Sequence, residues 1–300
     1  MATLYVFCGL PGCGKSTKAE EFKRFYGESV EVVSTDAIRE EVFGDIHTQE
    51  HNTEVFNIAY KRIKEFSETK EVVIFDATNT TMKSRKRIFN CGIDRKKHEI
   101  VCVVFNTPFR ECIIRDSKRS KYVGKKVIEK FYNSFQIPFK EEGWDRIIYG
   151  GNIVVDGIRD FFLEMIGFDQ ETKWHTLSLD EHCKKVCSNL KEEETYNRIV
   201  NKEKQGFYMI MAAYLHDYGK LFTQTFSEDG QAHYYNHANV GTYELFSKGL
   251  IDLDVLFYIN YHMLPFNWNS EKTINKYNNI FGVEKTSNLL LLNECDRKEK

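Results

Sequence analysis

Short apolar runs alternate with amphipathic segments along the first half of the chain. Five of these runs predict buried parallel strands, because strands covered on both faces are apolar throughout instead of alternating. They span residues 4–8, 30–34, 71–76, 99–105 and 145–149. Between the runs, apolar residues recur at helical spacing, as at Ala19, Phe22 and Phe25, and predict helices with one buried face. Strands that alternate with helices predict an α/β domain built on a parallel sheet.

Helical spacing of apolar residues predicts further helices over residues 55–66, 82–91 and 125–135. In the first of these we expect an inward face of Phe56, Ala59, Ile63 and Phe66.

The pattern changes near residue 150. Gly150-Gly151 begins a seam, an amphipathic helix is predicted over 158–166, and from about residue 172 the pattern is nearly all helical. We therefore predict three parts in chain order: an α/β domain over residues 1–152, a linker helix within 153–171 and an all-α domain over 172–300.

Composition agrees with two globular domains. The chain has 300 residues, enough for two cores, with 42% hydrophobic and 29% charged residues. Its formal net charge of -2 excludes a globally basic nucleic-acid binder but leaves room for a local basic groove. Eight cysteines without a CxxC pair predict reduced thiols, and with no leader before the first strand and no membrane-length apolar run we expect a cytoplasmic protein.

The first strand leads into Gly9-x-x-x-x-Gly14-Lys15-Ser16, and a helix follows at once. Strand, glycine loop and helix in this order predict a P-loop, in which backbone N–H groups and the helix N-terminus bind phosphates. Lys15 would reach the β- and γ-phosphates of ATP or another NTP, and the Ser16 hydroxyl would bind Mg²⁺. The residues expected to contact the nucleotide are Gly9, Gly12, Cys13, Gly14, Lys15, Ser16, Thr17, Arg115 and Arg119.

Two strands are followed by acidic residues at the edge where open α/β sheets bind ligands. Asp36 follows the second strand and is expected to act as general base toward an acceptor hydroxyl, or else to cap its helix. Arg39 shares its helix face and could hold an acceptor phosphate, or be a surface charge. Asp76 ends the third predicted strand, where it would contact Mg²⁺ or cap a turn, and Asn79 could orient the acceptor or make that turn.

Basic residues cluster in two predicted helices. Residues 82–91 include Lys83, Arg85, Lys86 and Arg87, which could form a solvated face or contact nucleic acid. Arg115 and Arg119 are four residues apart after the fourth strand, where a P-loop kinase carries its lid, so we expect them to close over the transferred phosphoryl group.

Histidine and aspartate concentrate in the second half. His216 and Asp217 are adjacent near the end of an apolar helix, where both could reach one ion. The other candidate ligands are His182, His237, His262 and Asp296, with His175 as an alternative to His182, and His237 and His262 could hold a second ion. Mixed imidazole and carboxylate ligands suit Mn²⁺, Fe, Co²⁺ or Ni²⁺, although any one of these histidines taken alone is more often a core or surface residue. His47 and His51 have a possible metal spacing but are expected to be surface residues.

The first half resembles the 5′-polynucleotide kinases of the phage and bacterial end-repair type. The resemblance covers residues 1 to about 150 and rests on the P-loop, Asp36-x-x-Arg39, Asp76-Ala77-Thr78-Asn79 and the stretch from Arg115 to Arg119. It implies that Asp36 activates the 5′-hydroxyl, that Arg39 holds the acceptor phosphate, and that Arg119 stabilises the transferred group. Related kinases of small metabolites share much of this pattern.

The second half looks like the HD phosphohydrolase superfamily, whose pattern is His, then His-Asp, then Asp, sometimes with two further histidines. The match is to His182, His216-Asp217, His237, His262 and Asp296, and Lys220 resembles a lysine that contacts phosphate there. Because the sequence given stops four residues past Asp296, that ligand is the least secure. The resemblance implies hydrolysis of phosphoesters by a metal-activated water.

Together the resemblances imply a P-loop kinase domain followed by an all-α HD domain, as in bifunctional nucleic-acid end-healing enzymes, although those carry the HD part first. We expect catalytic roles for Lys15, Asp36, Arg39, Arg119, Asp217 and Lys220, RNA or DNA ends as substrates, and a ligase acting downstream. Two alternatives stay open: a nucleoside-type kinase with an HD nucleotidase, and a regulator whose P-loop binds ATP without turnover.

Overall fold

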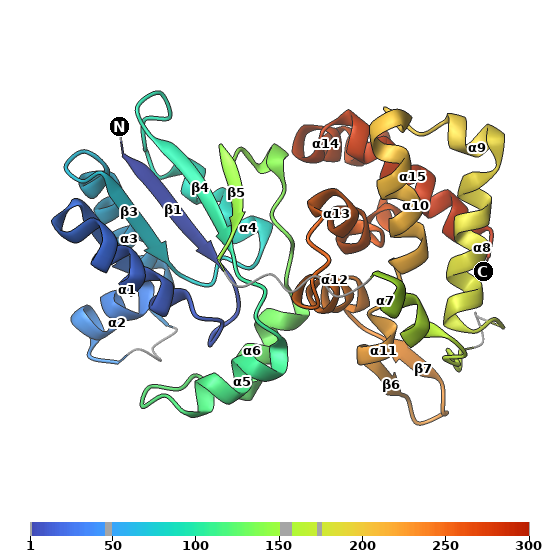
Figure 1. Ribbon diagram of the computed structural model, residues 1–300, viewed down its shortest axis with the longest axis horizontal. Helices are drawn as coiled ribbons and strands as arrows, with labels where there is room; N and C mark the ends of the chain where they lie inside the picture. Colours follow the sequence, from blue (N-terminus) through green and yellow to red (C-terminus); the bar gives the residue numbers. More distant parts are fainter. Residues whose placement is uncertain (1, 46–49, 151–157, 173–175, 300) are drawn as a thin grey trace. The chain divides into compact units, whose positions relative to one another are not determined.

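Two compact units make up the chain (Figure 1). The computed structural model describes residues 2–45, 50–150, 158–172 and 176–299, so the candidate residues His47 and His175 lie outside it. Unit 1 comprises Met1–Tyr132 and Glu142–Ile153, and unit 2 comprises Asn133–Glu141 and Val154–Lys300. The chain therefore enters unit 2 briefly and returns to unit 1 before it enters unit 2 for good.

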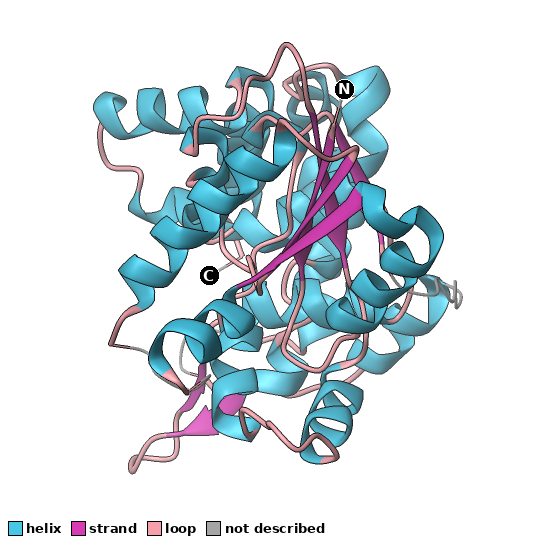
Figure 2. Cartoon of the chain, turned by 90° about the vertical axis from the view of Figure 1, so that its left-hand side faces the viewer, coloured by secondary structure: helices cyan, strands magenta, loops and turns pink. Residues whose placement is uncertain are grey.

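Unit 1 is built on a parallel sheet of five strands. Figure 2 draws these strands in magenta, together with the short hairpin of the second unit. The strands are β1 (Thr3–Cys8), β2 (Val30–Ser34), β3 (Val72–Asp76), β4 (Glu99–Val104) and β5 (Arg146–Tyr149), in the order β2-β3-β1-β4-β5. All four pairings are parallel, so the predicted α/β domain with a parallel sheet is confirmed. Strands β2 and β3 lie on one side of β1, and β4 and β5 lie on the other. The loop after β1 therefore lies at the switch point, where such sheets bind ligands.

Helices connect these strands. They are α1 (Lys15–Tyr26), α2 (Thr35–Phe43), α3 (Asn52–Ser67), α4 (Met82–Lys86), α5 (Phe109–Ser117) and α6 (Lys125–Asn133). Short 3₁₀ turns follow α1 and α4 at Gly27–Ser29 and Ile88–Asn90, and another spans Lys140–Glu142.

The inward faces predicted for two helices are partly wrong. Phe25 is 82% exposed, because α1 presents Ala19 and part of Phe22 to the sheet instead. In α3 the buried residues include Val55, Ala59 and Ile63, while the larger aromatic residues lie at the boundary. The helix predicted over 82–91 is interrupted after Lys86 and continues as a 3₁₀ turn.

Arg85 was expected on a basic, exposed face but is completely buried. Its guanidinium donates two hydrogen bonds to the Glu142 carboxylate, at 2.6 and 2.7 Å, and a third to the Asn79 carbonyl at 3.1 Å. A charge with no exposure requires such a partner, since desolvation of an unpaired ion costs several kcal/mol. Arg85 is therefore a structural residue of unit 1.

Unit 2 is mostly helical, as the apolar pattern predicts. Its helices are α7 (Ile158–Met165), α8 (Leu179–Lys191), α9 (Glu193–Asn197), α10 (Lys202–Leu215), α11 (Lys220–Thr223), α12 (His237–Ser247), α13 (Leu253–Tyr261), α14 (Glu271–Phe281) and α15 (Val283–Arg297), with a 3₁₀ turn at Leu264–Asn267. The antiparallel hairpin of β6 (Gln224–Phe226) and β7 (Ala232–Tyr234) was not predicted. The core forms where α10 packs against α8 and α13, and where α13 packs against α12.

Helix α7 is attached to the rest of unit 2 by a polar cluster. The Tyr218 hydroxyl donates to the Glu164 carboxylate at 2.5 Å, and Lys248 Nζ lies 2.7 Å from that carboxylate and 2.8 Å from the hydroxyl. Because Tyr218 directly follows Asp217, these contacts also hold the turn that carries the His-Asp pair. No helix among the described residues is long and apolar enough to cross a membrane.

The Arg85–Glu142 pair supplies a test of the fold. We expect Arg85→Met to lower the free energy of unfolding by about 3–5 kcal/mol, because it leaves Glu142 as a buried, unpaired charge. The measurement is urea unfolding followed by circular dichroism. Arg62→Met is the control, since Arg62 pairs with the exposed Glu41 and solvent screens such a pair, so its loss should change stability much less. Equal losses in the two variants would contradict the assignment of Arg85 as a structural residue.

Candidate functional site

The P-loop follows β1 and ends where α1 begins. Gly12 and Gly14 have positive φ angles of 80° and 99°, and this left-handed backbone suits glycine and turns successive N–H groups toward one point. The buried Lys15 ammonium donates to the carbonyls of Gly9 and Leu10 at 3.0 and 2.7 Å. The lysine is therefore held over the loop by its own backbone.

Helix α5 packs directly on this loop. A Cβ at Gly12 would lie 2.3 Å from the Cys112 carbonyl, so only glycine permits the approach. Thr107 Oγ1 adds a hydrogen bond to the Cys13 carbonyl at 2.9 Å. The close contact explains why the loop and the segment predicted as a lid come together.

Ser16 and Asp76 meet beside the P-loop. The Ser16 hydroxyl donates to Asp76 Oδ2 at 2.9 Å, because β1 and β3 are neighbours and both end at this edge of the sheet. Burial raises the pKa of Asp76, whereas the nearby Lys15 charge and the Ser16 hydrogen bond lower it. A buried carboxylate paired with a hydroxyl is a fitting donor set for Mg²⁺, which prefers oxygen ligands.

Asn79 has a different role from the acceptor contact considered for it. Its backbone is left-handed, with φ of 46°, and its side chain donates to the Phe7 carbonyl at 2.9 Å. It therefore makes the turn after β3.

Asp36 and Arg39 lie together on α2. Ser34 caps this helix, so Asp36 does not, and its carboxylate accepts a hydrogen bond from Arg39 at 2.8 Å. Arg39 is only 7% exposed and is therefore no surface charge. Its second terminal nitrogen donates to Asn52 Oδ1 at 2.7 Å, a contact that the sequence does not indicate, because Asn52 is thirteen residues away in the chain.

The lid arginines are placed differently from each other. Arg115 lies on α5 with Nη1 3.7 Å from where a Gly14 Cβ would be, so its guanidinium flanks the P-loop. Arg119 lies two residues beyond the end of α5, so the two arginines do not share a helix face, although their spacing of four residues suits one. Its guanidinium is 3.8 Å from the buried Asp116 carboxylate, which also accepts from the N–H groups of Val123 and Gly124.

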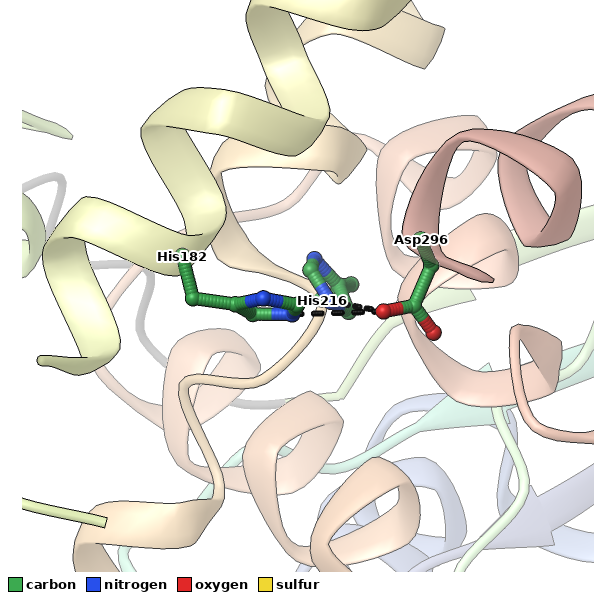
Figure 3. A group of neighbouring side chains, drawn as sticks. All are labelled: His182, His216 and Asp296. Carbon is green, nitrogen blue, oxygen red and sulfur yellow. Dashed lines mark ion pairs between the residues drawn. The ribbon is translucent and has the colours of Figure 1, made fainter. Parts of the chain in front are cut away.

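Unit 2 gathers histidines and aspartates from distant segments. Figure 3 shows His182 on α8, His216 at the end of α10 and Asp296 on α15 pointing toward one another. His182 Nε2 is 3.2 Å from Asp296 Oδ1, and His216 Nε2 is 3.8 Å from the same oxygen. Within the described residues, Asp217, His237 and His262 form a second group whose candidate ligand atoms all lie within 4.8 Å of one another.

Three of these imidazoles are oriented in the same way. The Nδ1 atoms of His216, His237 and His262 face backbone carbonyls three residues earlier, at 2.9, 2.8 and 2.7 Å. A carbonyl only accepts, so each Nδ1 carries the proton and each Nε2 presents a lone pair when the ring is neutral. This is the tautomer in which histidine binds a metal.

Asp217 lies between the two groups. Its Oδ1 is 3.1 Å from His237 Nε2 and 3.6 Å from His262 Nε2, whereas its Oδ2 is 3.4 Å from His216 Nε2. The expectation that His216 and Asp217 reach one ion is thus extended: the carboxylate faces both groups. Lys220 Nζ lies 2.6 Å from Asp217 Oδ2 and 2.7 Å from Gln170 Oε1. Burial by itself would raise the pKa of Asp217, but the Lys220 charge and the nearby imidazoles hold this pKa well below its usual range.

The donor sets fit divalent cations. The Nε2 atoms of His237 and His262 are 3.2 Å apart, and two lone pairs at this distance repel unless a proton or cation lies between them. Burial lowers the pKa of His262 to about 4, so at neutral pH that ring does not supply a proton by charging. Ligands on one ion with bonds of about 2.1 Å are separated by roughly 3–3.5 Å, close to the spacing here.

A second close backbone approach sets this geometry. A Cβ at Gly219 would lie 1.9 Å from the His237 carbonyl and 2.6 Å from the N–H of Gly241. The turn after Asp217 therefore touches the first turns of α12. Sequence reasoning did not single out either glycine.

The glycine contact can be tested by Gly219→Ala. The added methyl would push the His216–Asp217 turn away from α12, and we expect Mn²⁺ affinity to fall by about 10–100-fold, the range seen when ligand orientation is disturbed. Equilibrium dialysis measures the affinity. Ser247→Ala, farther along α12, serves as control, and wild-type affinity in Gly219→Ala would show that the close approach is not required.

Comparisons with known proteins give a family match in the first half of the chain and similarity to solved structures. Residues 4–138 match the family model AAA_33, described as an AAA domain. The chain is similar to a chain of the Pnkp1/Rnl/Hen1 RNA repair complex, with 27% identity over 43% of this chain and 42% of that one and a TM-score of 0.38. It is also similar to a chain of a second Pnkp1/Rnl/Hen1 complex, with 22% identity over 52% and 49% of the two chains and a TM-score of 0.34. A fungal RNA kinase is 18% identical over 52% of this chain and 78% of its own, with a TM-score of 0.37. The matches thus span less than half of either RNA repair chain.

Proposed function

We propose that unit 1 transfers the γ-phosphate of ATP to the 5′-hydroxyl of RNA or DNA, and that unit 2 removes a 3′-terminal or 2′,3′-cyclic phosphate. The observation that carries the first half is the buried Arg39, held at the carboxyl edge of the sheet by Asp36 and Asn52. The observation that carries the second half is Asp217, which faces two groups of metal-ligand residues.

In the donor half of the kinase site, the P-loop backbone holds the β- and γ-phosphates. Lys15 would exchange its loop carbonyls for phosphate oxygens, and Ser16 with Asp76 would hold Mg²⁺, whose charge would offset that of the phosphates. Arg115 at the edge of the loop and Arg119 beyond α5 supply positive charge to the group in transfer.

The acceptor half depends on α2. Asp36 is 57% exposed at its side chain, so an incoming hydroxyl can reach it, and its carboxylate takes the proton as the oxygen attacks. Before that step, Arg39 releases Asp36 and binds the phosphate next to the hydroxyl through its two terminal nitrogens. An acceptor with a neighbouring phosphate is what distinguishes a polynucleotide end from a free nucleoside.

At the second site, two divalent cations of the Mn²⁺, Fe, Co²⁺ or Ni²⁺ class supply Lewis acidity and a water activated at neutral pH. His182, His216 and Asp296 would hold one, and His237 and His262 the other, with Asp217 contacting both. Lys220, next to Asp217, is placed to bind a phosphate oxygen of the substrate. One chain would thus heal both ends of a broken strand for a ligase.

The kinase assignment is tested by Asp36→Asn. We expect phosphate transfer from labelled ATP to a 5′-hydroxyl oligonucleotide to fall by about 10²–10⁴-fold, because the general base is lost while ATP binding is retained. Glu41→Gln on the same helix is the control.

Two outcomes would reject this half of the proposal. Phosphorylation of free nucleosides but not oligonucleotides would indicate a small-molecule kinase. Phosphotransfer that is absent from the wild type while ATP binds would indicate a nucleotide-gated regulator.

The phosphoesterase assignment is tested by His216→Ala. Release of phosphate from a 3′-phosphorylated oligonucleotide should be lost, because the first metal group loses a ligand, while kinase activity in the same sample is kept. His233→Ala, which removes a histidine outside both groups, should leave both activities unchanged. Full phosphoesterase activity in His216→Ala would show that this cluster is not the site.

A further inference from the structure

Nine residues of unit 2 come from between two elements of unit 1. Asn133–Glu141 begins at the last residue of α6 and precedes β5, yet belongs to unit 2 by its contacts. We call this stretch the crossover segment. The AAA domain match ends at residue 138, inside it. The segment contains no residue of the P-loop and no candidate metal ligand of unit 2, so neither site explains its position.

The crossover segment is hydrogen-bonded to two helices by asparagine side chains. Asn260, on α13, accepts from the Ile137 N–H at 2.8 Å and donates to the Phe135 carbonyl at 3.3 Å. Asn239, on α12, donates to the same Phe135 carbonyl at 2.8 Å. One backbone carbonyl thus joins the two helices.

Both asparagines lie next to candidate metal ligands. Asn239 is two residues after His237, at the start of α12, and Asn260 is two residues before His262, at the end of α13. The Nε2 atoms of these histidines are 3.2 Å apart. The crossover segment therefore ties together the two helix ends whose separation sets the distance between the ligands.

Apolar packing holds the segment in the core of unit 2. Phe139 is 1% exposed and its ring contacts Phe257, Tyr261 and Phe281, with centroid distances of 5.2, 5.8 and 5.3 Å. Phe135 contacts Tyr243 of α12 edge to face at 5.0 Å. These aromatic rings bury too much area to leave the core at little cost, so the segment is a fixed part of unit 2.

A buried lysine anchors the far end. Lys285 on α15 is 5% exposed and pairs with Glu141 at 2.9 Å and with Asp254 of α13 at 3.0 Å. Its ammonium also lies over the Phe257 ring, 4.6 Å from the centroid. The segment is thus attached at both of its ends, with the Phe135 carbonyl between α12 and α13.

We propose that Asn239 and Asn260 are positioning residues of the second site, which through the crossover segment hold His237 and His262 at the separation that one cation requires. The inference rests on the proposed metal site of unit 2. It adds that this site is incomplete without nine residues encoded before the last strand of unit 1. Loss of the amide bonds would let the end of α13 move relative to α12, and metal ligation is sensitive to such shifts.

Full-length variants test the proposal with Mn²⁺ as the probe. Equilibrium dialysis gives the number of ions and their affinities, and circular dichroism gives the unfolding temperature. We expect Asn260→Ala to weaken one of two ions by about 10-fold, the lower end of the range for residues behind the ligands, and to leave the other unchanged. Asn239→Ala, which removes one hydrogen bond instead of two, should have a smaller effect in the same direction.

Two further variants calibrate the result. Asn260→Asp keeps the acceptor for Ile137 but loses the donor to Phe135, so its affinity should lie between those of the wild type and Asn260→Ala. Asn275→Ala, on the exposed face of α14, should bind both ions as the wild type does.

The outcomes separate the inference from the proposed function. If Asn260→Ala and Asn239→Ala melt at lower temperature but bind Mn²⁺ as the wild type does, the asparagines are merely structural and the inference is wrong. If Asn260→Ala does not fold, the Mn²⁺ affinity of Asn239→Ala decides instead, because Asn239 is only half-buried. A wild type that binds no Mn²⁺, or as much as His216→Ala, rejects the metal site itself and the inference with it.

Discussion

Buried charge is the constraint on which both units depend. Asp76 in unit 1 and Asp217 in unit 2 are carboxylates with almost no exposure, and each is retained because cations or hydrogen-bond donors surround it. Asp76 has Lys15 and Ser16 nearby, and Asp217 has Lys220 and four imidazoles. Desolvation of an isolated carboxylate would cost several kcal/mol, so these partners are conditions for folding as well as for chemistry.

Close approach of backbones is the second constraint. At Gly12 the P-loop meets the Cys112 carbonyl of α5, and at Gly219 the turn after Asp217 meets the His237 carbonyl of α12. In each case a side chain on the glycine would push its turn away from the helix that packs against it. The two units have different folds, yet in each of them a glycine allows two backbone segments to touch.

The chain passes between the two units more than once. The crossover segment leaves unit 1 after α6, takes part in the aromatic core of unit 2, and returns to form β5. Division of the protein near residue 153 would therefore remove from unit 2 the rings of Phe135 and Phe139 and the partner of Lys285. Removal of this segment would leave polar side chains of α12 and α13 unpaired in the core, which is costly.

The sequence by itself determined the local features. Apolar runs and helical spacing predicted the strands, the parallel sheet and the helical second half, because backbone conformation and burial leave a periodic signal. The P-loop could be predicted from its spacing alone, because the motif and its flanking strand and helix are contiguous in the chain. The candidate ligands of unit 2 could be named, and His237 and His262 could be set apart for a second ion. That Asp217 lies with those two histidines could not be predicted, since it depends on distances between α10, α12 and α13.

Only the tertiary structure decided how distant residues combine. Arg85 looked like one of four exposed basic residues, and its burial depends on Glu142, fifty-seven residues away. Asn52 beside Arg39, and Asn260 beside the crossover segment, are ordinary polar residues in sequence, because an asparagine carries no signal of the group it will bond. Contacts between segments far apart are set by packing, which composition and periodicity do not encode, and in this protein those contacts determine how Asp36, Arg39, Asp217 and the histidines are held.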